Sequence, residues 1–129
     1  MKSVLIDTNI YTHALRGYQE TISVLQQVQE IGICSISIGE LLSGFKAGAR
    51  EKKNREELAE FLDSPRVRIF GIDEETAEFY ATILDGLRKQ GKPVPTNDVW
   101  IAAVAFQYGF PLFTMDRHFE KIPGLALVP

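Results

Sequence analysis

The sequence predicts an α/β domain in which a mostly parallel, five-stranded sheet is flanked by helices on both faces. Short runs of apolar and β-branched residues alternate with segments of helical periodicity along the whole chain. Parallel strands need a long crossover between them, and the helical segments are long enough to supply it. A length of 129 residues is usual for one domain, so we expect a single domain over residues 1–129.

The predicted strands are short runs dominated by Val, Ile, Leu and Phe. Each run ends at a polar residue, a glycine or a proline, which interrupts the extended pattern. They span Val4–Ile6, Ile33–Ile36, Val67–Phe70, Leu112–Phe113 and Leu125–Val128.

The predicted helices repeat their apolar residues every three or four positions, as Ile22, Leu25 and Val28 do. They span Ile10–Leu15, Thr21–Ile31, Ile38–Ala49, Arg55–Leu62, Glu74–Lys89, Val99–Tyr108 and the short turn Arg117–Glu120.

The composition is that of an ordinary globular protein, with 45% hydrophobic and 24% charged residues. No apolar run is long enough to span a membrane, and the charge at Asp7 comes too early for a signal peptide. Cys34 is the only cysteine, so no internal disulfide forms within the chain, and we expect it to be a small buried residue. These features predict a cytoplasmic protein.

The net charge of −3 argues weakly against nucleic-acid binding, which depends on Lys and Arg. If four of the 17 acidic residues occupy one metal site, however, the remaining charges are close to balance. Basic residues also gather in two stretches, which are interpreted either as solvated helix surface or as a footprint for phosphates. The stretches contain Lys46, Arg50, Lys52, Lys53 and Arg55, and Arg88, Lys89 and Lys92.

Four acidic residues follow apolar runs at the points where the pattern turns helical: Asp7, Glu40, Asp98 and Asp116. In a parallel α/β sheet such points lie along one edge. Four carboxylates gathered there would repel one another and lose water, and a hard divalent cation among them would offset both costs. The pattern therefore predicts metal-assisted chemistry on a phosphate.

Each of these acids also has an interpretation without chemistry. Asp7, Asp98 and Asp116 stand where N-caps accept backbone N–H groups, and Glu40 fits a capping box with Ser37. Asp73 also opens a helix after an apolar run, and we interpret it as a cap outside the site.

Taken together, the acids favour a metal site, because neutral capping groups stand beside three of them and a metal specifically needs anionic oxygens. These neighbours are Thr8, Asn9, Thr96, Asn97 and Thr114.

The chain resembles the PIN-domain ribonucleases, particularly the toxins of VapBC toxin-antitoxin pairs. The resemblance covers nearly the whole sequence and rests on blocks in the expected order. These are VLIDTNI (4–10), SIGELLSG (37–44), NDVWIAA (97–103), FTMDRHF (113–119) and the closing IPGL (122–125).

The resemblance implies a PIN fold, a homodimer, an RNA substrate and a small VapB-like antitoxin as partner. It also implies a site for Mg²⁺ or Mn²⁺ made by the four acids. The chain departs from a common form of the pattern at His118, where many relatives carry an acid. From the sequence we expect His118 and His13 to be polar packing residues, and Trp100 to contact the core or a dimer partner.

The predicted function is an endoribonuclease that uses Mg²⁺ or Mn²⁺. Asp7 and Asp98 are assigned as principal metal ligands, Asp116 completes the site, and Glu40 orients or deprotonates the attacking water. We expect Asn9 and Thr114 to hydrogen-bond the carboxylates.

Other functions remain open at this point. A PIN-fold nuclease could process RNA without an antitoxin, and a non-catalytic binding module could keep the fold. A receiver domain would carry adjacent acids after the first strand, whereas Asp7 stands alone. A haloacid-dehalogenase-like phosphatase would need an acid where Asn9 stands.

Overall fold

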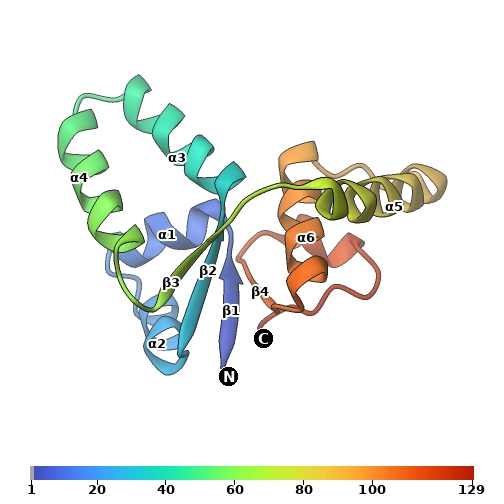
Figure 1. Ribbon diagram of the computed structural model, residues 1–129, viewed down its shortest axis with the longest axis horizontal. Coiled ribbons are helices and arrows are strands. Elements are labelled where there is room, and N and C mark those ends of the chain that lie inside the picture. The colour runs from blue at the N-terminus through green and yellow to red at the C-terminus, as the bar shows by residue number, and fades with distance from the viewer. Residues whose placement is uncertain (1) are drawn as a thin grey trace.

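The computed structural model describes residues 2–129, which fold around a sheet of four parallel strands in the order β3-β2-β1-β4 (Figure 1). The register pairs Ile6 of β1 with Ile33 of β2 on one side and with Phe113 of β4 on the other. The strands are β1 (Ser3–Ile6), β2 (Glu30–Cys34), β3 (Val67–Phe70) and β4 (Leu112–Phe113).

Helices connect the strands and cover both faces of the sheet, as the sequence predicts (Figure 1). Helices α5 and α6 lie on one side, and α1 to α4 lie on the other, with α3 and α4 forming an arm that projects from the sheet. The helices are α1 (Thr8–Leu15), α2 (Gln19–Gln27), α3 (Ser35–Ala47), α4 (Glu51–Leu62), α5 (Glu74–Gln90), α6 (Thr96–Tyr108) and the 3₁₀ helix η1 (Arg117–Lys121).

The alternation of side chains along the central strands builds a core on each face. Leu5 of β1 packs with the buried residues of α6, whereas its neighbours Val4 and Ile6 pack toward α1 and α3. All three side chains are completely buried. A strand buried on both faces explains why this segment is a continuous apolar run.

The fifth predicted strand, Leu125–Val128, is reduced to one parallel bridge between Leu112 and Leu127. Two backbone hydrogen bonds hold it, from Leu112 N–H to the Ala126 carbonyl (2.8 Å) and from Val128 N–H to the Leu112 carbonyl (2.9 Å). Because β4 has only two residues, the segment Leu125–Val128 has too short a neighbouring strand to pair with over its whole length.

Several predicted boundaries were wrong by a few residues. Strand β2 begins at Glu30, inside the predicted helix Thr21–Ile31, and ends at Cys34 because α3 already begins at Ser35. Helix α4 begins at Glu51 rather than at Arg55.

Trp100 stacks on Tyr80, with 3.9 Å between the ring centroids. Within residues 2–129, none of the helices has the length and apolar character needed to cross a membrane.

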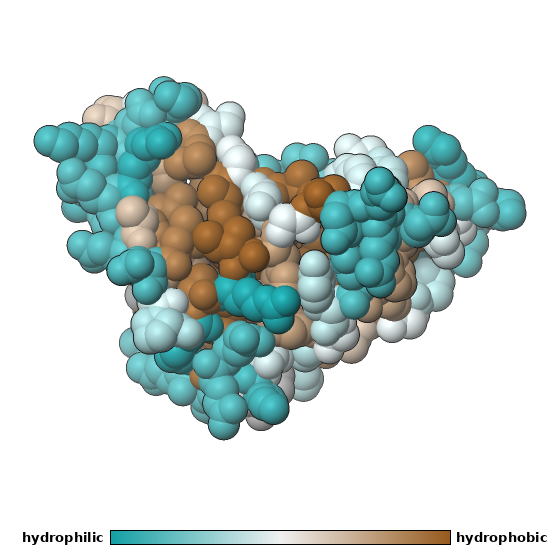
Figure 2. Space-filling view, viewed as in Figure 1, coloured by the Kyte–Doolittle hydropathy of each residue, from teal (hydrophilic) through white to brown (hydrophobic). Residues whose placement is uncertain are grey.

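Apolar residues gather on the face drawn in Figure 2, in the hollow between the α3–α4 arm and strand β3. Hydrophilic residues surround this area along α4 and α2. On the arm, the apolar residues Ile38, Leu42, Phe45 and Phe61 are only partly buried. Ile69 on β3 leaves 49% of its surface exposed. This area is called the arm hollow below.

Candidate metal and active site

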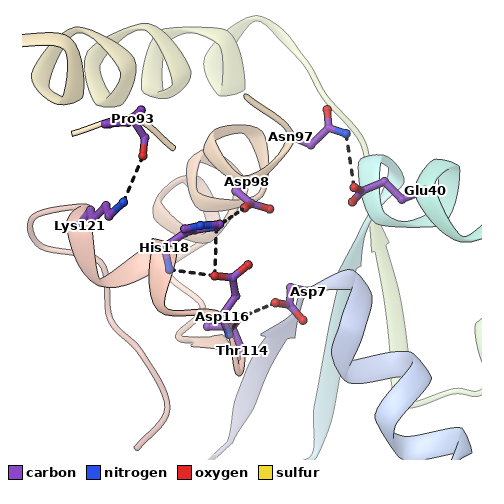
Figure 3. A network of polar contacts seen from close by, with 9 residues as sticks. All are labelled: Asp7, Glu40, Pro93, Asn97, Asp98, Thr114, Asp116, His118 and Lys121. Atoms are coloured by element: carbon purple, nitrogen blue, oxygen red, sulfur yellow. Dashed lines mark hydrogen bonds and ion pairs between the residues drawn. The ribbon is translucent and has the colours of Figure 1, made fainter. Parts of the chain in front are cut away.

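The four acids singled out in the sequence converge at the edge where the strands end (Figure 3). Asp7 directly follows β1, Glu40 lies in α3 after β2, and Asp116 comes shortly after β4. Asp98 has no strand before it, and lies instead in the first turn of α6, which packs against α3 and η1. The edge of the sheet and the start of one helix therefore bring the four carboxylates together.

Asp7 is the most buried of the four, with 4% of its surface exposed. Its Oδ1 accepts a hydrogen bond from the backbone N–H of Ile10 (3.0 Å), so it caps α1 as well. Its Oδ2 accepts a hydrogen bond from the hydroxyl of Thr114. Burial raises the pKa of the Asp7 carboxyl, and both hydrogen bonds oppose the rise. Asp7 thus caps α1, and its second carboxylate oxygen is held by Thr114 next to Asp116.

Asp98 is held in the most repulsive surroundings of the site. Burial, followed by the negative charges of Asp116, Glu40 and Asp7, raises its pKa to about 6. Only the charge of His118 opposes these causes. Within residues 2–129 the only polar side-chain contact recorded for this carboxylate is the imidazole of His118, 3.7 Å from Oδ2.

Glu40 is exposed and is held by two neutral donors. The hydroxyl of Thr8 donates to its Oε1 (2.6 Å), and the amide of Asn97 donates to its Oε2 (3.4 Å). The alternative interpretation of Glu40 as part of a capping box with Ser37 was wrong, because α3 begins three residues earlier than expected, at Ser35 with Cys34 as N-cap. Ser37 is instead completely buried inside the first part of α3.

The two residues expected to hydrogen-bond the carboxylates differ in outcome. Thr114 contacts Asp7 through its hydroxyl, which also accepts a hydrogen bond from the backbone N–H of Asp116 (2.9 Å). Asn9 lines the site, but the described hydrogen bonds do not include one from its side chain to an acid. The sequence analysis missed Thr8 and Asn97, although both adjoin a predicted acid along the chain.

His118, which was expected to be a polar packing residue, lies against two of the acids. Its Nδ1 lies 3.1 Å from Oδ1 of Asp116 and 3.7 Å from Oδ2 of Asp98 (Figure 3). Its backbone N–H also donates to Oδ1 of Asp116 (2.9 Å), which fixes the start of η1 against that carboxylate. Nothing in the residue's own type or spacing distinguished it from a packing histidine.

Three of the acids, Glu40, Asp98 and Asp116, open into a polar hollow of about 370 Å³. A second hollow of about 640 Å³ adjoins it along α3 and shares Glu40 and Asn97 with it. The first is lined by Asn9, Glu40, Pro95, Thr96, Asn97, Asp98, Asp116 and His118. The second is lined by Ser35, Ile36, Gly39, Glu40, Ser43, Gly44 and Asn97, and is called the α3 groove below.

The donor set at this edge fits a divalent cation. Asp98, Asp116 and His118 each offer one ligand atom, and these atoms lie within 4.8 Å of one another. A cation would relieve the repulsion that raises the pKa of Asp98. Carboxylate oxygens suit Mg²⁺ and Mn²⁺.

Asp73, at the start of α5, was predicted to be a cap and is one. Its Oδ1 accepts a hydrogen bond from the backbone N–H of Thr76 (3.0 Å), and the hydroxyl of Thr76 completes a capping box. This prediction is confirmed.

Residues 4–125 match the family model of the PIN domain. The chain belongs to the PIN-domain family. This PIN domain is 31% identical to ribonuclease VapC of Rickettsia bellii, over 97% of the chain and 94% of that protein. It is 33% identical to ribonuclease VapC1 of Rickettsia felis, with the same two coverages.

Solved structures of VapBC complexes share the same fold. The PIN domain matches a chain of the DNA-bound VapBC of Salmonella typhimurium with a TM-score of 0.85 and 26% identity, covering 99% of this chain and 98% of that one. A chain of VapBC2 of Rickettsia felis, bound to a promoter DNA fragment, gives a TM-score of 0.84 at 26% identity, covering 98% and 97%. The chain is therefore a VapC-like PIN domain, and its relatives' names support an enzyme that acts on RNA.

Proposed function

We propose that the protein is an endoribonuclease that depends on Mg²⁺ or Mn²⁺ and hydrolyses RNA phosphodiester bonds. The observation that supports this most is the repulsive setting of Asp98, whose carboxyl has a pKa of about 6 among three other acids. Such crowding is unfavourable unless a cation binds. The similarity to ribonucleases of the VapC group gives the substrate class.

Asp7, Asp98 and Asp116 hold the cation, directly or through water. When bound, a divalent ion supplies a Lewis acid that polarises the phosphoryl group and lowers the pKa of bound water. Thr114 orients two of these acids, because its hydroxyl contacts Asp7 and the backbone of Asp116. It therefore acts as a positioning residue for the metal ligands.

Glu40 orients or deprotonates the attacking water. Its side chain is exposed, and the bonds from Thr8 and Asn97 aim it at the hollow that Asp98 and Asp116 also line. Attack of water on the phosphorus with departure of the 3′-oxygen leaves a 5′-phosphate and a 3′-hydroxyl.

The α3 groove gives the nucleotides next to the scissile phosphate a place to lie. It adjoins the acids, and two of its lining residues, Gly39 and Gly44, have no side chain that would obstruct a bound strand. Two exposed cations, Lys46 near the end of α3 and Arg50 just before α4, are suited to contact the phosphates of the strand.

The cellular role that we propose is that of the toxin in a toxin-antitoxin pair, acting in the cytoplasm as part of a homodimer. The arm hollow is an exposed apolar area suited to a small antitoxin of the VapB kind. A second apolar hollow of about 360 Å³, lined by Phe79, Ile83 and Phe106 among others, suits contact with a second copy.

A cleavage assay tests the proposed activity. Purified protein is incubated with single-stranded RNA in the presence of Mg²⁺, Mn²⁺ or EDTA, alongside Asp98→Asn. We expect cleavage with either metal, none with EDTA, and almost none with the variant. Cleavage that is equally fast with EDTA, or in Asp98→Asn, would exclude the proposal.

The path of the RNA is tested at Gly39. A Cβ at this position meets no atom within 4 Å, so a side chain fits and would project into the α3 groove. We expect Gly39→Leu to reduce RNA cleavage about tenfold while keeping the fold, because alanine or leucine is favoured over glycine in a helix by up to ~1 kcal/mol. Gly39→Ala is the matched control, with the same gain in helix propensity and little obstruction.

A further inference from the structure

His118 is the residue of the site whose chemistry the four acids do not explain. Within the described residues, Asp98, Asp116 and His118 form a group that could hold a metal ion, and His118 is its only member with nitrogen atoms in the side chain. The side chain of His118 is 46% exposed, so burial in the core does not explain its position. A role in packing is therefore a poor explanation for its position.

One of the two distances around His118 matches the separation of neighbouring ligands of one ion, and the other is longer. Ligands at about 2.1 Å from an octahedral ion lie about 3.0 Å apart when they are adjacent. The separation between Nδ1 of His118 and Oδ1 of Asp116 is 3.1 Å, and Oδ2 of Asp98 is 3.7 Å from the same nitrogen. One ligand atom from each of Asp98, Asp116 and His118 lies within 4.8 Å of the other two, so the three side chains are close enough to share one ion.

The backbone around His118 is held firmly, which makes the position suitable for a ligand. The N–H of His118 donates to Asp116, and the next residue, Phe119, is 1% exposed and anchors η1 in the core. The side chain thus leaves a fixed turn and points between two acids (Figure 3).

We propose that His118 is a nitrogen ligand of the bound cation and biases the site toward first-row transition ions such as Mn²⁺ over Mg²⁺. This inference rests on the proposed function, since it concerns the same ion. Imidazole nitrogen is a common ligand of transition ions, whereas Mg²⁺ prefers oxygen. A neutral nitrogen also adds a ligand without adding a third negative charge beside Asp98 and Asp116.

The chain has two histidines, His13 and His118, so nitrogen ligation can be assigned by substitution. Mn²⁺ alone is added to the metal-free protein, and pulsed electron paramagnetic resonance measures the coupling of the ion to nitrogen. We expect imidazole coupling in the wild type and in His13→Gln, and none in His118→Gln. Bound Mn²⁺ without such coupling, or with coupling that survives His118→Gln, would overturn the proposal.

Calorimetric titration with Mn²⁺ and Mg²⁺ measures the bias itself. We expect His118→Gln to weaken Mn²⁺ binding about tenfold or more and to change Mg²⁺ binding less than about threefold. Arg117→Gln is the matched control, because Arg117 is an exposed neighbour in η1 that is outside the proposed ligand set. An unchanged ratio of the two affinities in His118→Gln would contradict the proposal.

The two proposals fail in distinguishable ways. If the wild type cleaves RNA with bound Mn²⁺ but shows no nitrogen coupling, only the role of His118 is wrong. If neither metal binds up to the millimolar range, or if Asp98→Asn cleaves RNA as the wild type does, the proposed function is wrong, and with it the role of His118.

Discussion

Asp73 and Asp98 both stand at the beginning of long helices, and their surroundings are opposite. Asp73 accepts hydrogen bonds from the backbone of Thr76 (3.0 Å) and from the amide of Gln107 (3.0 Å). These donors lower the pKa of its carboxyl. Asp98 is partly buried among other acids, and its pKa rises to about 6.

The difference separates an acid that stabilises its own helix from one that is held ready for a ligand. Hydrogen bonds from neutral donors favour the charged form of Asp73 within the protein itself. The charged form of Asp98 lacks such donors and needs a cation from outside. Sequence position does not distinguish the two residues, whereas their partners do.

RNA cleavage should separate the two acids most strongly. We expect Asp98→Asn to reduce the Mg²⁺-dependent cleavage rate roughly a thousandfold, because a charged ligand is lost. Asp73→Asn should leave the rate within about twofold, since Asn keeps the cap and lies outside the site. Initial rates on a fluorescent RNA oligonucleotide measure both. Equal losses of cleavage rate in Asp98→Asn and Asp73→Asn would contradict the proposed difference between the two acids.

Metal-induced stabilisation should follow the same division. A cation at one hundred times its dissociation constant adds about 2.7 kcal/mol to the free energy of unfolding. Thermal unfolding with and without Mg²⁺ should reveal this gain in the wild type and in Asp73→Asn, and almost none in Asp98→Asn. A full gain in Asp98→Asn would place the cation elsewhere.

In the metal-free protein at pH 7, the two substitutions should change stability in opposite directions. Asp98→Asn removes a crowded, partly desolvated charge, and we expect about 1–2 kcal/mol of added stability. Asp73→Ala removes the cap of α5 and should destabilise the fold. Urea unfolding in EDTA measures both changes. A loss of stability in Asp98→Asn would show that its charge is already compensated.

The pH dependence of stability should carry the smallest effect. Because the pKa of Asp98 is raised, the contribution of its carboxyl to the free energy of unfolding is fully present below pH 3.8. That contribution is lost as the pH rises through about 6. The wild type should therefore gain about 1 kcal/mol over Asp98→Asn between pH 7 and pH 5, measured by urea unfolding without metal. Asp73 works in the other direction, because its lowered pKa gives stability above pH 3.8 that disappears in stronger acid.

Most of the fold could be predicted because local patterns determine it. Val4, Leu5 and Ile6 form a continuous apolar run because their strand is buried on both faces. The fifth strand could not be predicted correctly, since its length depends on how much of β4 is left to pair with Leu127. The start of α3 was also misplaced, because Ser35 begins the helix without a capping side chain to signal it.

The site was predictable only in part. Asp7, Glu40 and Asp116 follow strands that end at one edge, and topology alone brings them together. The hydrogen-bond partners of these acids come from residues that are distant in the sequence. Glu40 accepts hydrogen bonds from Thr8, which is 32 positions away, and from Asn97, which is 57 positions away. His118 reaches Asp98 only because η1 turns back toward α6, and neither the periodicity nor the motif around His118 reveals this contact.

The central claim is that Asp98 is kept in an unfavourable setting that a divalent cation relieves. Carbon-13 NMR titration of the aspartate carboxyl groups, assigned with Asp98→Asn, measures this directly with and without Mg²⁺. We predict a pKa of about 6 for Asp98 without the metal and a value below the usual 3.8 when Mg²⁺ is saturating. A pKa near 3.8 that is the same in both conditions would contradict the account.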